Sequence, residues 1–496
     1  MAKELKRYKL SINGRWEEAA SGKCFETVNP YTGEAWALLP EGGEEDVDRA
    51  VRAAREAFES KEWKSLTGGQ RGQLLRRLGD LIAQHAERLA RIETTDNGKI
   101  IRETTFQLKA IPDCYYYFAG WADKIHGEVI PTDKPTILNY TLREPIGVVG
   151  AIIPWNSPLY LTSIKLAPAL AAGNTVVIKP SEITSVSALE FIQLVEEAGF
   201  PPGAVNVVTG FGEKAGAALT KHQLVGKIAF TGGCETGKLV AKSAADHLAR
   251  VTLELGGKSP NIVFEDADLD SAVNGAMAGI FAATGQTCIA GSRLFLHESI
   301  HDRFVEKLVA RAKTIKMGDP TSWGTEMGPL AFKDQREKVL TYVEIGKEEG
   351  AKLVYGGEPP TDPELKKGYF VKPTVFVDVE NHMRIAQEEI FGPVVSVIRF
   401  RTEEEVIQMA NDVRYGLAAG LWTQDVKRVH RLAKELQAGT VWVNTYRTLA
   451  FSSPFGGYKE SGIGKENGFE VLREYTQLKS VWVETGGPIG DPFVMR

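Results

Sequence analysis

The stretch NTVVIKPSEITSVSALEFIQLVEEAGFPPGAVNVVT, residues 174–209, indicates the fold class of this chain most directly. It begins with NTVVIK and ends with AVNVVT, two short β-branched runs of the kind found in buried strands. Between them, residues 185–198 carry apolar side chains at helical spacing, which predicts an amphipathic helix. A strand, a helix and a second strand in this order form the repeating unit of a parallel sheet.

The same alternation continues on both sides of this unit. The apolar runs IGVVGAII, KIAFT and RVTLEL occupy residues 146–153, 227–231 and 250–255, and helical stretches separate them. After Gly256-Gly257 a second series begins, with the runs NIVFED, RLFLHE, TVFVDV, VVSVIRF, LAAGLWT and TVWVN. We therefore expect an α/β protein with a doubly wound parallel sheet, a second α/β domain and a boundary near residue 256.

Two segments have strand character but lie outside this alternation. They are GEVIPTDKPTILNYTLREP, residues 127–145, and LKSVWVETG, residues 478–486. Strands without partners in the main sheets are available to pair with other strands. We expect them to form an extended arm that pairs with another subunit.

Length and composition are those of an ordinary globular protein and exclude several classes of partner. A chain of 496 residues is long enough for two or three domains. The net charge is −5 and the basic residues are scattered. This balance gives no electrostatic reason to expect a nucleic acid or an anionic membrane as partner.

The four cysteines, Cys24, Cys114, Cys234 and Cys288, are too few and too dispersed for a disulfide framework. No CxxC pair occurs, and the eight histidines lack zinc-ligand spacing, so we expect no metal site. Residues 1–16 contain no apolar stretch of the kind that a secretory signal needs. These features predict reduced thiols and a cytoplasmic location.

Residues 271–292 carry no charged side chain, and this length is sufficient to span a bilayer. The segment is rich in Gly and Ala, however, and contains Asn274, Gln286 and several hydroxyl groups. We therefore favour a buried helix and loop over a membrane span.

Polar residues and glycines follow each strand of the first series. The sequences at these strand ends are PWN at 154–156, KPSE at 179–182, GFG at 210–212, TGG at 231–233 and ELGG at 254–257. Because ligands bind outside the carboxyl ends of the strands in open α/β sheets, this collection predicts a nucleotide site at one sheet edge.

Two glycine-rich motifs compete for the phosphate groups of such a ligand. GFGEKA, residues 210–215, fits the dinucleotide-binding pattern, although the acidic residue expected about 20 positions later is not evident. GGCETGK, residues 232–238, approaches a P-loop, but Leu239 stands where a magnesium-binding Ser or Thr is required. An NTPase is therefore disfavoured, whereas a glycine turn before a helix N-terminus still suits a pyrophosphate.

Cys288 and Glu254 each allow two interpretations from the residues alone. Cys288, in TGQTCIAGS, is either a buried inert thiol or a nucleophile to which its small neighbours give access. Glu254 is either a strand-end carboxylate paired with a lysine or a general base beside a small molecule.

Seven motifs distributed along the chain resemble the aldehyde dehydrogenase superfamily. They are PWNSP, KPSE, FTGG, LELGGKSP, GQTCIAGS, EEIFGP and SPFGGYKESGIGKENG, and their order and spacing agree with the family from about Gly14 to the last strand. The resemblance implies a Rossmann-like NAD-binding domain at 1–123 and 145–256 and a catalytic domain at 257–470. It also implies a small β oligomerisation arm at 124–144 and 471–496, in a homodimer or homotetramer.

The resemblance further implies an NAD-dependent, non-acylating oxidation of a small-molecule aldehyde to a carboxylate. Cys288 matches the nucleophile that forms first a thiohemiacetal and then a thioester. Asn156 and the backbone N–H of Cys288 match the oxyanion hole, in which each donor is typically worth about 3–4 kcal/mol. Glu254 matches the base that activates water, and Glu466 matches a second carboxylate linked to proton removal.

For the cofactor, Lys179 and Glu182 match the family's contacts with the adenosine ribose. A carboxylate at Glu182 favours a free 2′-hydroxyl, so the resemblance favours NAD over NADP without excluding NADP. Gly212 would lie near the adenine and Trp155 beside the adenosine half. The remaining matches are Glu389 and Phe391 at the nicotinamide ribose and Thr231, Gly232 and Gly233 at the pyrophosphate, with Gly233 replacing a serine of many relatives.

The substrate tunnel implied by the resemblance is roomy, because Ala110, Ser157 and Ala282 stand where many relatives have bulkier residues. Its other expected wall residues are Tyr160, Leu161, Ile164, Thr287, Ile289, Arg447, Leu449 and Phe455. Arg447 falls in the loop at the tunnel mouth. Our hypothesis is that its guanidinium selects an aldehyde with a distal carboxylate or similar polar group; the alternative is a surface arginine.

Two competing functions remain at this point. In a CoA-acylating dehydrogenase, CoA takes the acyl group in place of water, but such relatives usually lack the carboxylate found here as Glu254. A catalytically silent scaffold protein is the other alternative, and the presence of Cys288, Asn156 and Glu254 argues against it.

Overall fold

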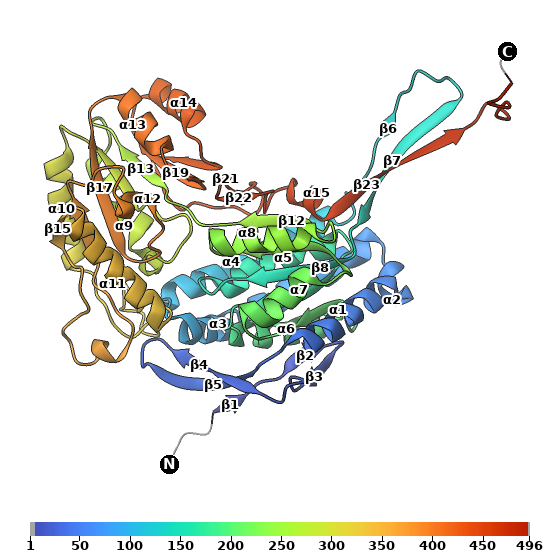
Figure 1. Ribbon diagram of the computed structural model, residues 1–496, viewed down its shortest axis with the longest axis horizontal. Coiled ribbons are helices and arrows are strands. Elements are labelled where there is room, and N and C mark those ends of the chain that lie inside the picture. The colour runs from blue at the N-terminus through green and yellow to red at the C-terminus, as the bar shows by residue number, and fades with distance from the viewer. Residues whose placement is uncertain (1–4, 495–496) are drawn as a thin grey trace.

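The protein consists of two α/β lobes and a β arm that projects away from them (Figure 1). Its structure is a computed structural model that describes residues 5–494. Residues 1–4 and 495–496, the outer ends of the predicted first domain and of the predicted arm, lie outside the described residues.

The first lobe contains an eight-stranded sheet in the order β22-β12-β11-β8-β9-β10-β2-β3. The five strands predicted from the β-branched runs are its parallel centre, which confirms the predicted parallel sheet. The strands are β2 (Leu10–Ile12), β3 (Arg15–Glu17), β8 (Val148–Ile153), β9 (Thr175–Pro180), β10 (Val205–Val207), β11 (Val225–Thr231), β12 (Arg250–Glu254) and β22 (Gly462–Ile463).

The strand order places a topological switch point beside β8. From β8 the chain moves outward through β9 and β10 on one side and then through β11 and β12 on the other. Connections that leave β8 and β11 in opposite directions open a crevice at their carboxyl ends. In the register of this edge, Thr231 of β11 lies opposite Glu254 of β12.

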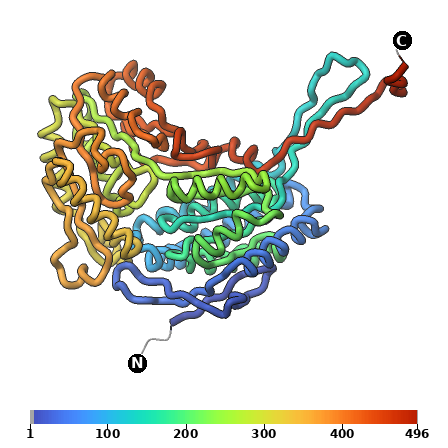
Figure 2. Tube along the Cα trace, viewed as in Figure 1, coloured from blue at the N-terminus to red at the C-terminus, as the bar shows by residue number. Residues whose placement is uncertain are grey.

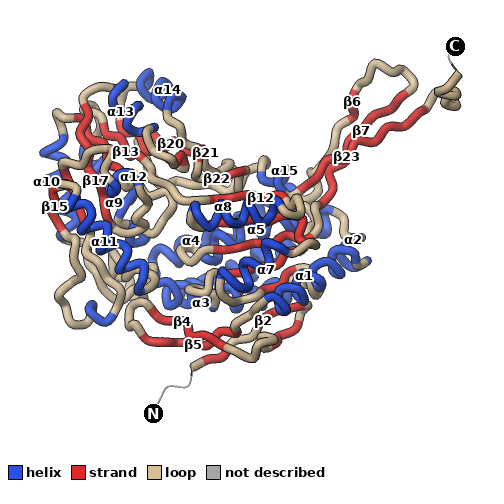
Figure 3. The backbone as a smooth tube through the Cα atoms, in the orientation of Figure 1, coloured by secondary structure: helices blue, strands red, loops and turns tan. Residues whose placement is uncertain are grey.

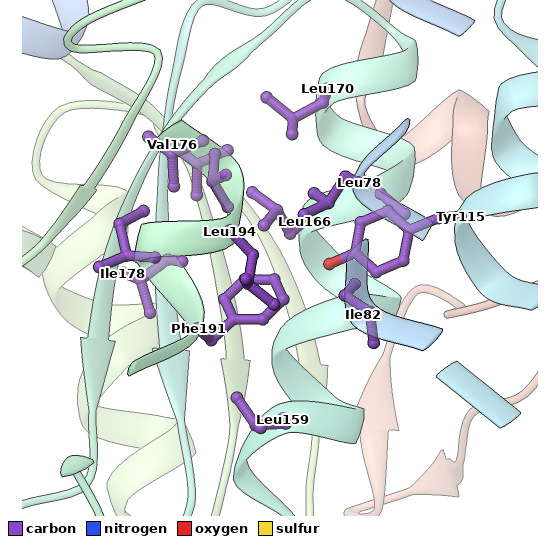
Figure 4. Packing of buried hydrophobic residues seen from close by; sticks show 14 of the residues in the cluster. Leu78, Ile82, Tyr115, Leu159, Leu166, Leu170, Val176, Ile178, Phe191 and Leu194 are labelled. Atoms are coloured by element: carbon purple, nitrogen blue, oxygen red, sulfur yellow. The ribbon is translucent and has the colours of Figure 1, made fainter. Parts of the chain in front are cut away.

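Helices cover both faces of this sheet (Figure 3), and the alternation along β9 shows how. Val176 and Ile178 are buried in one apolar cluster with α3 to α6, whereas Val177 is buried in a second cluster on the other face with α1, α7 and α8. Figure 4 shows Ile178 close to Phe191 and Leu194 of α6. The helices are α1 (Glu44–Glu59), α2 (Lys61–Lys64), α3 (Gly68–Asn97), α4 (Ile101–Trp121), α5 (Pro158–Ala171), α6 (Val186–Glu197), α7 (Ala217–Lys221) and α8 (Cys234–Ala245).

The second lobe contains a seven-stranded sheet in the order β15-β16-β17-β14-β13-β19-β20, parallel except for β15. Its strands are β13 (Pro260–Val263), β14 (Arg293–His297), β15 (Lys352–Tyr355), β16 (Thr374–Val377), β17 (Val394–Phe400), β19 (Ala418–Trp422) and β20 (Thr440–Val443). Its helices are α9 (Leu269–Ile280), α10 (His301–Lys313), α11 (Lys333–Glu348), α12 (Arg384–Gln387), α13 (Glu403–Asn411) and α14 (Val426–Glu435).

The uncharged segment 271–292 belongs to α9 and to the loop that follows it, and most of its residues are buried. Within residues 5–494, no helix combines the length and the apolar character needed to cross a membrane.

The arm is a three-stranded antiparallel sheet formed by two segments far apart in the sequence. It contains β6 (Val129–Ile130), β7 (Ile137–Pro145) and β23 (Thr476–Glu484). All nine residues of β23 pair with β7, from Thr476 opposite Pro145 to Glu484 opposite Ile137, and Figure 2 shows the two segments side by side. Both segments that fell outside the predicted alternation are therefore strands of one structure.

The sequence patterns did not predict the N-terminal strands. A separate sheet in the order β1-β5-β4 precedes the first helix, with β1 (Lys6–Arg7), β4 (Cys24–Asn29) and β5 (Glu34–Pro40). The remaining short elements are a π-helix at Gly212–Gly216, 3-10 turns at Ala282–Gly285 and Leu365–Lys367, β18 (Tyr415–Gly416), β21 (Tyr458–Lys459) and α15 (Val471–Glu474).

Candidate active site

A cavity of about 1140 Å³ lies at the carboxyl edge of the first sheet, where the loops after β8, β11 and β12 meet residues of the second lobe. It brings together most of the residues that the sequence singled out. The predicted residues that line it are Ala110, Trp155, Asn156, Ser157, Tyr160, Leu161, Ile164, Thr231, Gly232, Gly233, Glu254, Ala282, Thr287, Cys288, Ile289, Glu389, Phe391, Arg447, Leu449 and Phe455.

Four predicted site residues do not line this cavity. They are Lys179, Glu182, Gly212 and Glu466. Lys179 lies at the end of β9, Glu182 follows β9 and Gly212 follows β10, and these parallel strands are on the far side of β8 from β11 and β12. Glu466 is wholly buried behind the cavity wall.

A left-handed turn before Cys288 sets the position of its thiol. Ala283 and Thr284 have φ values of 51° and 56°, which non-glycine residues rarely adopt, and Gly285 follows at 70°. A Cβ on Gly285 would lie 2.1 Å from the carbonyl oxygen of Gly392, so only glycine fits there. Backbone strain of this kind persists where the surroundings enforce it, and it often accompanies functional sites.

Two hydrogen bonds hold this turn in place. The Ala283 N–H donates to Glu103 Oε1 at 2.9 Å, and Thr284 Oγ1 donates to the Gly328 carbonyl oxygen at 3.1 Å. Glu103 comes from α4 and itself lines the cavity. The turn is thus anchored from both lobes.

The Cys288 thiol is half-buried, and its surroundings favour the protonated form. Burial, together with the nearby carboxylates of Glu254 and Glu389, raises the pKa of Cys288 to about 12. The backbone N–H groups of Cys288 and Ile289 oppose this shift. Without a further positive charge or a proton acceptor, the sulfur therefore stays a thiol at neutral pH.

Asn156 lies three residues after the end of β8, and its amide is fixed by the loop that carries the thiol. Nδ2 donates to the Gln286 carbonyl oxygen at 3.1 Å. Gln286 is held in turn, because its Oε1 accepts the Ala331 N–H at 2.9 Å. One hydrogen on Asn156 Nδ2 is used in this contact, and the second remains to be donated to a ligand in the cavity.

Glu254 is the last residue of β12, and only 5% of its surface is exposed. Among the described residues, neither carboxyl oxygen has a hydrogen-bond partner. Burial and the Glu466 carboxylate raise the pKa of Glu254 well above its usual range, against the pull of Lys165 and Lys465. A Cβ on Gly456 would lie 2.6 Å from Glu254 Oε1, so this glycine makes room for the carboxyl group.

Glu466 is equally buried, but it has a cationic partner. Its Oε1 accepts a hydrogen bond from Lys165 Nζ of α5 at 2.5 Å, and both side chains are almost fully shielded from solvent. Glu466 therefore acts on Glu254 through its charge and makes no contact with the cavity.

The turn after β11 has the features of an anion site. Gly233 precedes α8 in an extended conformation, and no side chain caps the first N–H groups of this twelve-residue helix. A Cβ on Gly233 would meet nothing within 4 Å, so the space in front of the helix is open. Thr231 Oγ1 is buried and has no partner within the described residues. Free N–H groups and the helix dipole favour a phosphate at this point.

Two carboxylates border the rest of the predicted nucleotide site. Glu182 Oε2 pairs with the buried Lys179 Nζ at 3.0 Å. Glu389 Oε1 accepts the Gly257 N–H at 3.0 Å, and burial raises the pKa of Glu389. A Cβ on Gly256 would lie 2.4 Å from Glu389 Oε2, so glycine at this position leaves room for the Glu389 carboxyl group.

Trp155 packs in a group of aromatic rings that includes Phe391, one of the predicted nicotinamide residues. Its ring meets those of Phe391 and Phe332 edge-on, with centroid separations of 5.2 Å and 5.3 Å. We expected Trp155 beside the adenosine half and Phe391 at the nicotinamide ribose. The structure places these two side chains in contact.

Arg447 lines the cavity and is half-buried. Nη1 donates to the Ala278 carbonyl oxygen at 3.3 Å, and φ at this residue is 63°. One nitrogen of the Arg447 guanidinium is therefore hydrogen-bonded to the protein, and the other nitrogens remain available to a ligand.

Sequence reasoning missed one face of α4 that lines the cavity. Glu103, Phe106 and Gln107 share this face with Ala110, the only α4 residue that was predicted. Residues three and four apart lie on one side of a helix, so Ala110 itself carried the signal. Within residues 5–494, no group of three or more His, Cys, Asp and Glu side chains is arranged to hold a metal ion.

Comparison with known proteins gives one family over nearly the whole chain. A family model described as the aldehyde dehydrogenase family matches residues 16–481. A relative from Acinetobacter baylyi, named (Z)-2-((N-methylformamido)methylene)-5-hydroxybutyrolactone dehydrogenase, is 50% identical over 494 residues, covering 99% of this chain and 100% of the relative. Human mitochondrial aldehyde dehydrogenase is 50% identical over 478 residues, covering 96% of this chain and 92% of the relative.

The fold is similar to that of solved aldehyde dehydrogenases. The NAD+ complex of an aldehyde dehydrogenase from Bacillus cereus superposes with a TM-score of 0.94 at 51% sequence identity, and the match covers 97% of both chains.

Proposed function

Because this chain belongs to the aldehyde dehydrogenase family, we propose that it oxidises an aldehyde to the carboxylate, with NAD as the hydride acceptor. One observation carries the proposal. A thiol, a carboxyl group without partners and an amide nitrogen with a hydrogen to donate, from Cys288, Glu254 and Asn156, line the same cavity.

In the first step, the Cys288 sulfur attacks the aldehyde carbon and loses its proton. The proton needs an acceptor inside the cavity, because the pKa of Cys288 is raised to about 12. Water in the cavity takes this proton, so that Glu254, whose oxygens have no partner among the described residues and whose pKa is raised by burial, stays available for the later step.

The oxyanion of the resulting thiohemiacetal is held by two donors. These are the remaining hydrogen of Asn156 Nδ2 and the backbone N–H of Cys288. The amide is already locked onto the Gln286 carbonyl, so no reorganisation is required when the charge develops.

Loss of a hydride to bound NAD turns the thiohemiacetal on Cys288 into a thioester. Glu254 then takes a proton from water, which adds to the thioester carbon. The Cys288 thiolate leaves as the carboxylic acid is released. Glu466 supports the base through its charge, because it raises the pKa of Glu254.

The residues around the crevice fit a dinucleotide. The open space before α8 suits its pyrophosphate, together with the unpartnered Thr231 hydroxyl. Glu389, with one oxygen on Gly257, has its other oxygen available for a ribose hydroxyl. The Lys179–Glu182 pair offers a carboxylate to the adenosine ribose, which favours NAD over NADP because a 2′-phosphate would meet a like charge.

The finer substrate assignment in this proposal is a polar aldehyde in a roomy tunnel. The Acinetobacter relative is named for an oxygen-rich lactone, and Arg447 stands at the cavity mouth with part of its guanidinium unused. Arg447 would grip a distal carboxylate or a similar group.

The proposal also includes a homo-oligomer and a cytoplasmic location. The arm exposes large apolar side chains, among them Val129, Leu478 and Trp482, which suits pairing with a second copy. All four cysteines are free, as expected in a reducing compartment. Light scattering of the purified protein measures its oligomeric state.

The test is NADH formation with short aliphatic, aromatic, ω-carboxylic and quaternary-ammonium aldehydes, each with NAD and with NADP. We expect turnover of at least one class and a higher kcat/KM with NAD. If a folded protein forms no NADH or NADPH with any of them, the proposed oxidation is wrong.

A further inference from the structure

Lys99 is a buried cation that the turn between α3 and α4 directs into the interior. Gly98 ends α3 with φ at 75°, and the Lys99 N–H donates to Asn97 Oδ1 at 2.9 Å. A Cβ on Gly98 would lie 2.8 Å from both Pro30 and Pro329. The turn therefore requires glycine, and only 6% of the Lys99 surface is exposed.

The Lys99 ammonium group donates to two side chains of the cavity wall. Nζ lies 2.5 Å from Ser157 Oγ and 3.1 Å from Gln107 Oε1. Both Ser157 and Gln107 line the cavity. A lysine ammonium only donates hydrogen bonds, so each of these oxygens must be an acceptor.

This assignment leaves both side chains with hydrogens to donate. The Ser157 hydroxyl accepts from Lys99, and its own hydrogen meets no acceptor among residues 5–494. The Gln107 oxygen likewise faces Lys99, so its amide hydrogens point elsewhere, and none has an acceptor in the described part of the chain. An ammonium group that polarises a hydroxyl also strengthens the bond that the hydroxyl donates.

The Ser157 hydroxyl is free for this role because another residue caps the N-terminus of α5. Ser157 is the N-cap residue of α5, where a serine side chain normally accepts an N–H of the first turn. Here Glu93 Oε2 accepts the Leu159 N–H at 3.1 Å, and Ser157 makes no capping bond.

The charges around Lys99 favour a neutral ligand atom. Burial lowers the pKa of Lys99 and the Arg447 cation adds to this effect, whereas the carboxylates of Glu93 and Glu103 oppose it. Two cations and two carboxylates therefore balance one another here. Glu103 also lines the cavity one helical turn before Gln107. A ligand carboxylate at this point would meet Glu103 as a like charge, whereas a neutral oxygen would meet only the donors.

We propose that Ser157, oriented by Lys99, is a specificity-determining hydrogen-bond donor for a neutral acceptor oxygen carried by the aldehyde close to its carbonyl group. Ser157 directly follows Asn156, the proposed oxyanion donor, so the recognised oxygen belongs near the reacting carbon. The substrate class is an aldehyde with an ether, hydroxyl or carbonyl oxygen on the first or second carbon from the aldehyde group. This inference rests on the proposed function and concerns a different part of the substrate from Arg447.

The test compares aldehydes of equal length that differ in one atom. Methoxyacetaldehyde is paired with butanal, and 3-methoxypropanal with pentanal, because an ether oxygen accepts hydrogen bonds and donates none. The quantity measured is the ratio of kcat/KM for the ether over that for the alkyl aldehyde, with NAD present. We expect a ratio of about ten in favour of the ether for one of the pairs, the size of a single good hydrogen bond.

Three substitutions locate the effect. Ser157→Ala should bring the ratio to about one, and Ser157→Thr, which keeps a hydroxyl group, should preserve the preference. Ser163→Ala deletes a buried hydroxyl on the same helix that bonds only to the Leu159 carbonyl and Tyr115, and it should leave the ratio at the wild-type value.

Lys99 is a positioning residue, so its test uses the same ratio rather than total activity. Lys99→Met should lower the ratio, and Lys99→Arg should restore part of it, because the guanidinium still donates to Ser157. If Lys99 had a merely structural role, its substitution would change kcat/KM equally for both aldehydes and leave the ratio unaltered.

The outcomes separate this inference from the proposed function. Turnover of both aldehydes with a ratio near one for every pair, or a ratio that survives Ser157→Ala, overturns the inference alone. Absence of NADH with every aldehyde overturns the proposed function and the inference with it.

Discussion

Two walls of the same cavity treat their polar groups in opposite ways. In the thiol wall, the Glu254 carboxylate is close enough to raise the pKa of Cys288, yet no described side chain bonds the Glu254 oxygens. In the lysine wall, Lys99, Gln107 and Ser157 bond to one another.

The difference fits a proposed site in which reactivity and recognition are separated. A buried polar group without a partner destabilises the folded protein, and a substrate or a proton that binds to it lowers its free energy. A bonded network costs less and fixes which atoms face the ligand. We infer that the thiol wall performs the chemistry and the lysine wall selects the substrate.

The strongest way to break this comparison is to remove the sulfur. We expect Cys288→Ala to lower kcat by at least about a thousandfold, because no other group in the cavity can form a thioester. Cys24→Ala is the matched control, since Cys24 lies on β4 outside the cavity, and its kinetics should equal those of the wild type. Activity retained in Cys288→Ala would mean that the thiol wall has been assigned wrongly.

The next largest effect comes from the unpartnered carboxyl group. Glu254→Gln should lower steady-state turnover by about a hundredfold to ten-thousandfold, the usual contribution of a general base. A burst of NADH in the first turnover should persist, since hydride loss precedes hydrolysis. Glu298→Gln, which removes a surface carboxylate paired with Arg401, is the control. Unchanged steady-state turnover in Glu254→Gln would contradict the role of water activation.

A smaller effect is expected at the cavity mouth. Arg447→Ala should lower the ratio of kcat/KM for semialdehyde acids over neutral aldehydes by about tenfold, because a charge-assisted hydrogen bond is lost. Arg401→Ala, at an exposed surface ion pair, should leave this ratio unaltered. A ratio that stays the same in Arg447→Ala would show that Arg447 does not contact the substrate.

The smallest expected effect is a displacement of the pH profile. The proposed mechanism needs Glu254 ionised, and Glu466 raises the pKa of Glu254. Glu466→Gln removes this like charge and leaves the Lys165 cation unpaired, and both changes lower the pKa of Glu254. The acid limb of kcat/KM should therefore move to lower pH. Glu470→Gln, at a surface pair with Arg473, is the control, and a limb that stays in place or moves upward in Glu466→Gln would refute the coupling.

The sequence predicted the parallel sheets well because both depend on local patterns. Each β-branched run of the first series became a strand within a few residues of its expected ends, as in β9 and β12. The N-terminal strands β1 to β5 were not predicted, because they are short and gain their stability by pairing with distant segments. Ser11 of β2, for example, lies opposite Val207 of β10.

For the site, motifs located the side chains but not their partners. Lys165 and Glu466 form a pair although they are 301 residues apart in the sequence. The motifs could not show this pair, nor that Glu254 has no partner among the described residues. The lysine wall was missed for the same reason, since Lys99, Gln107 and Ser157 meet only through the packing of the α3–α4 turn against α5. The left-handed turn at Ala283 and Thr284 has no signal in residue type, because neither residue favours that conformation.

The most direct measurement of the central assignment is the intact mass of Glu254→Gln, quenched in acid after mixing with NAD and pentanal. If the thiol wall performs the chemistry, a subunit heavier by one acyl group should accumulate, and peptide mapping should place that group on Cys288. NADH formed without any acyl-enzyme, or with the acyl group on another residue, would contradict the assignment.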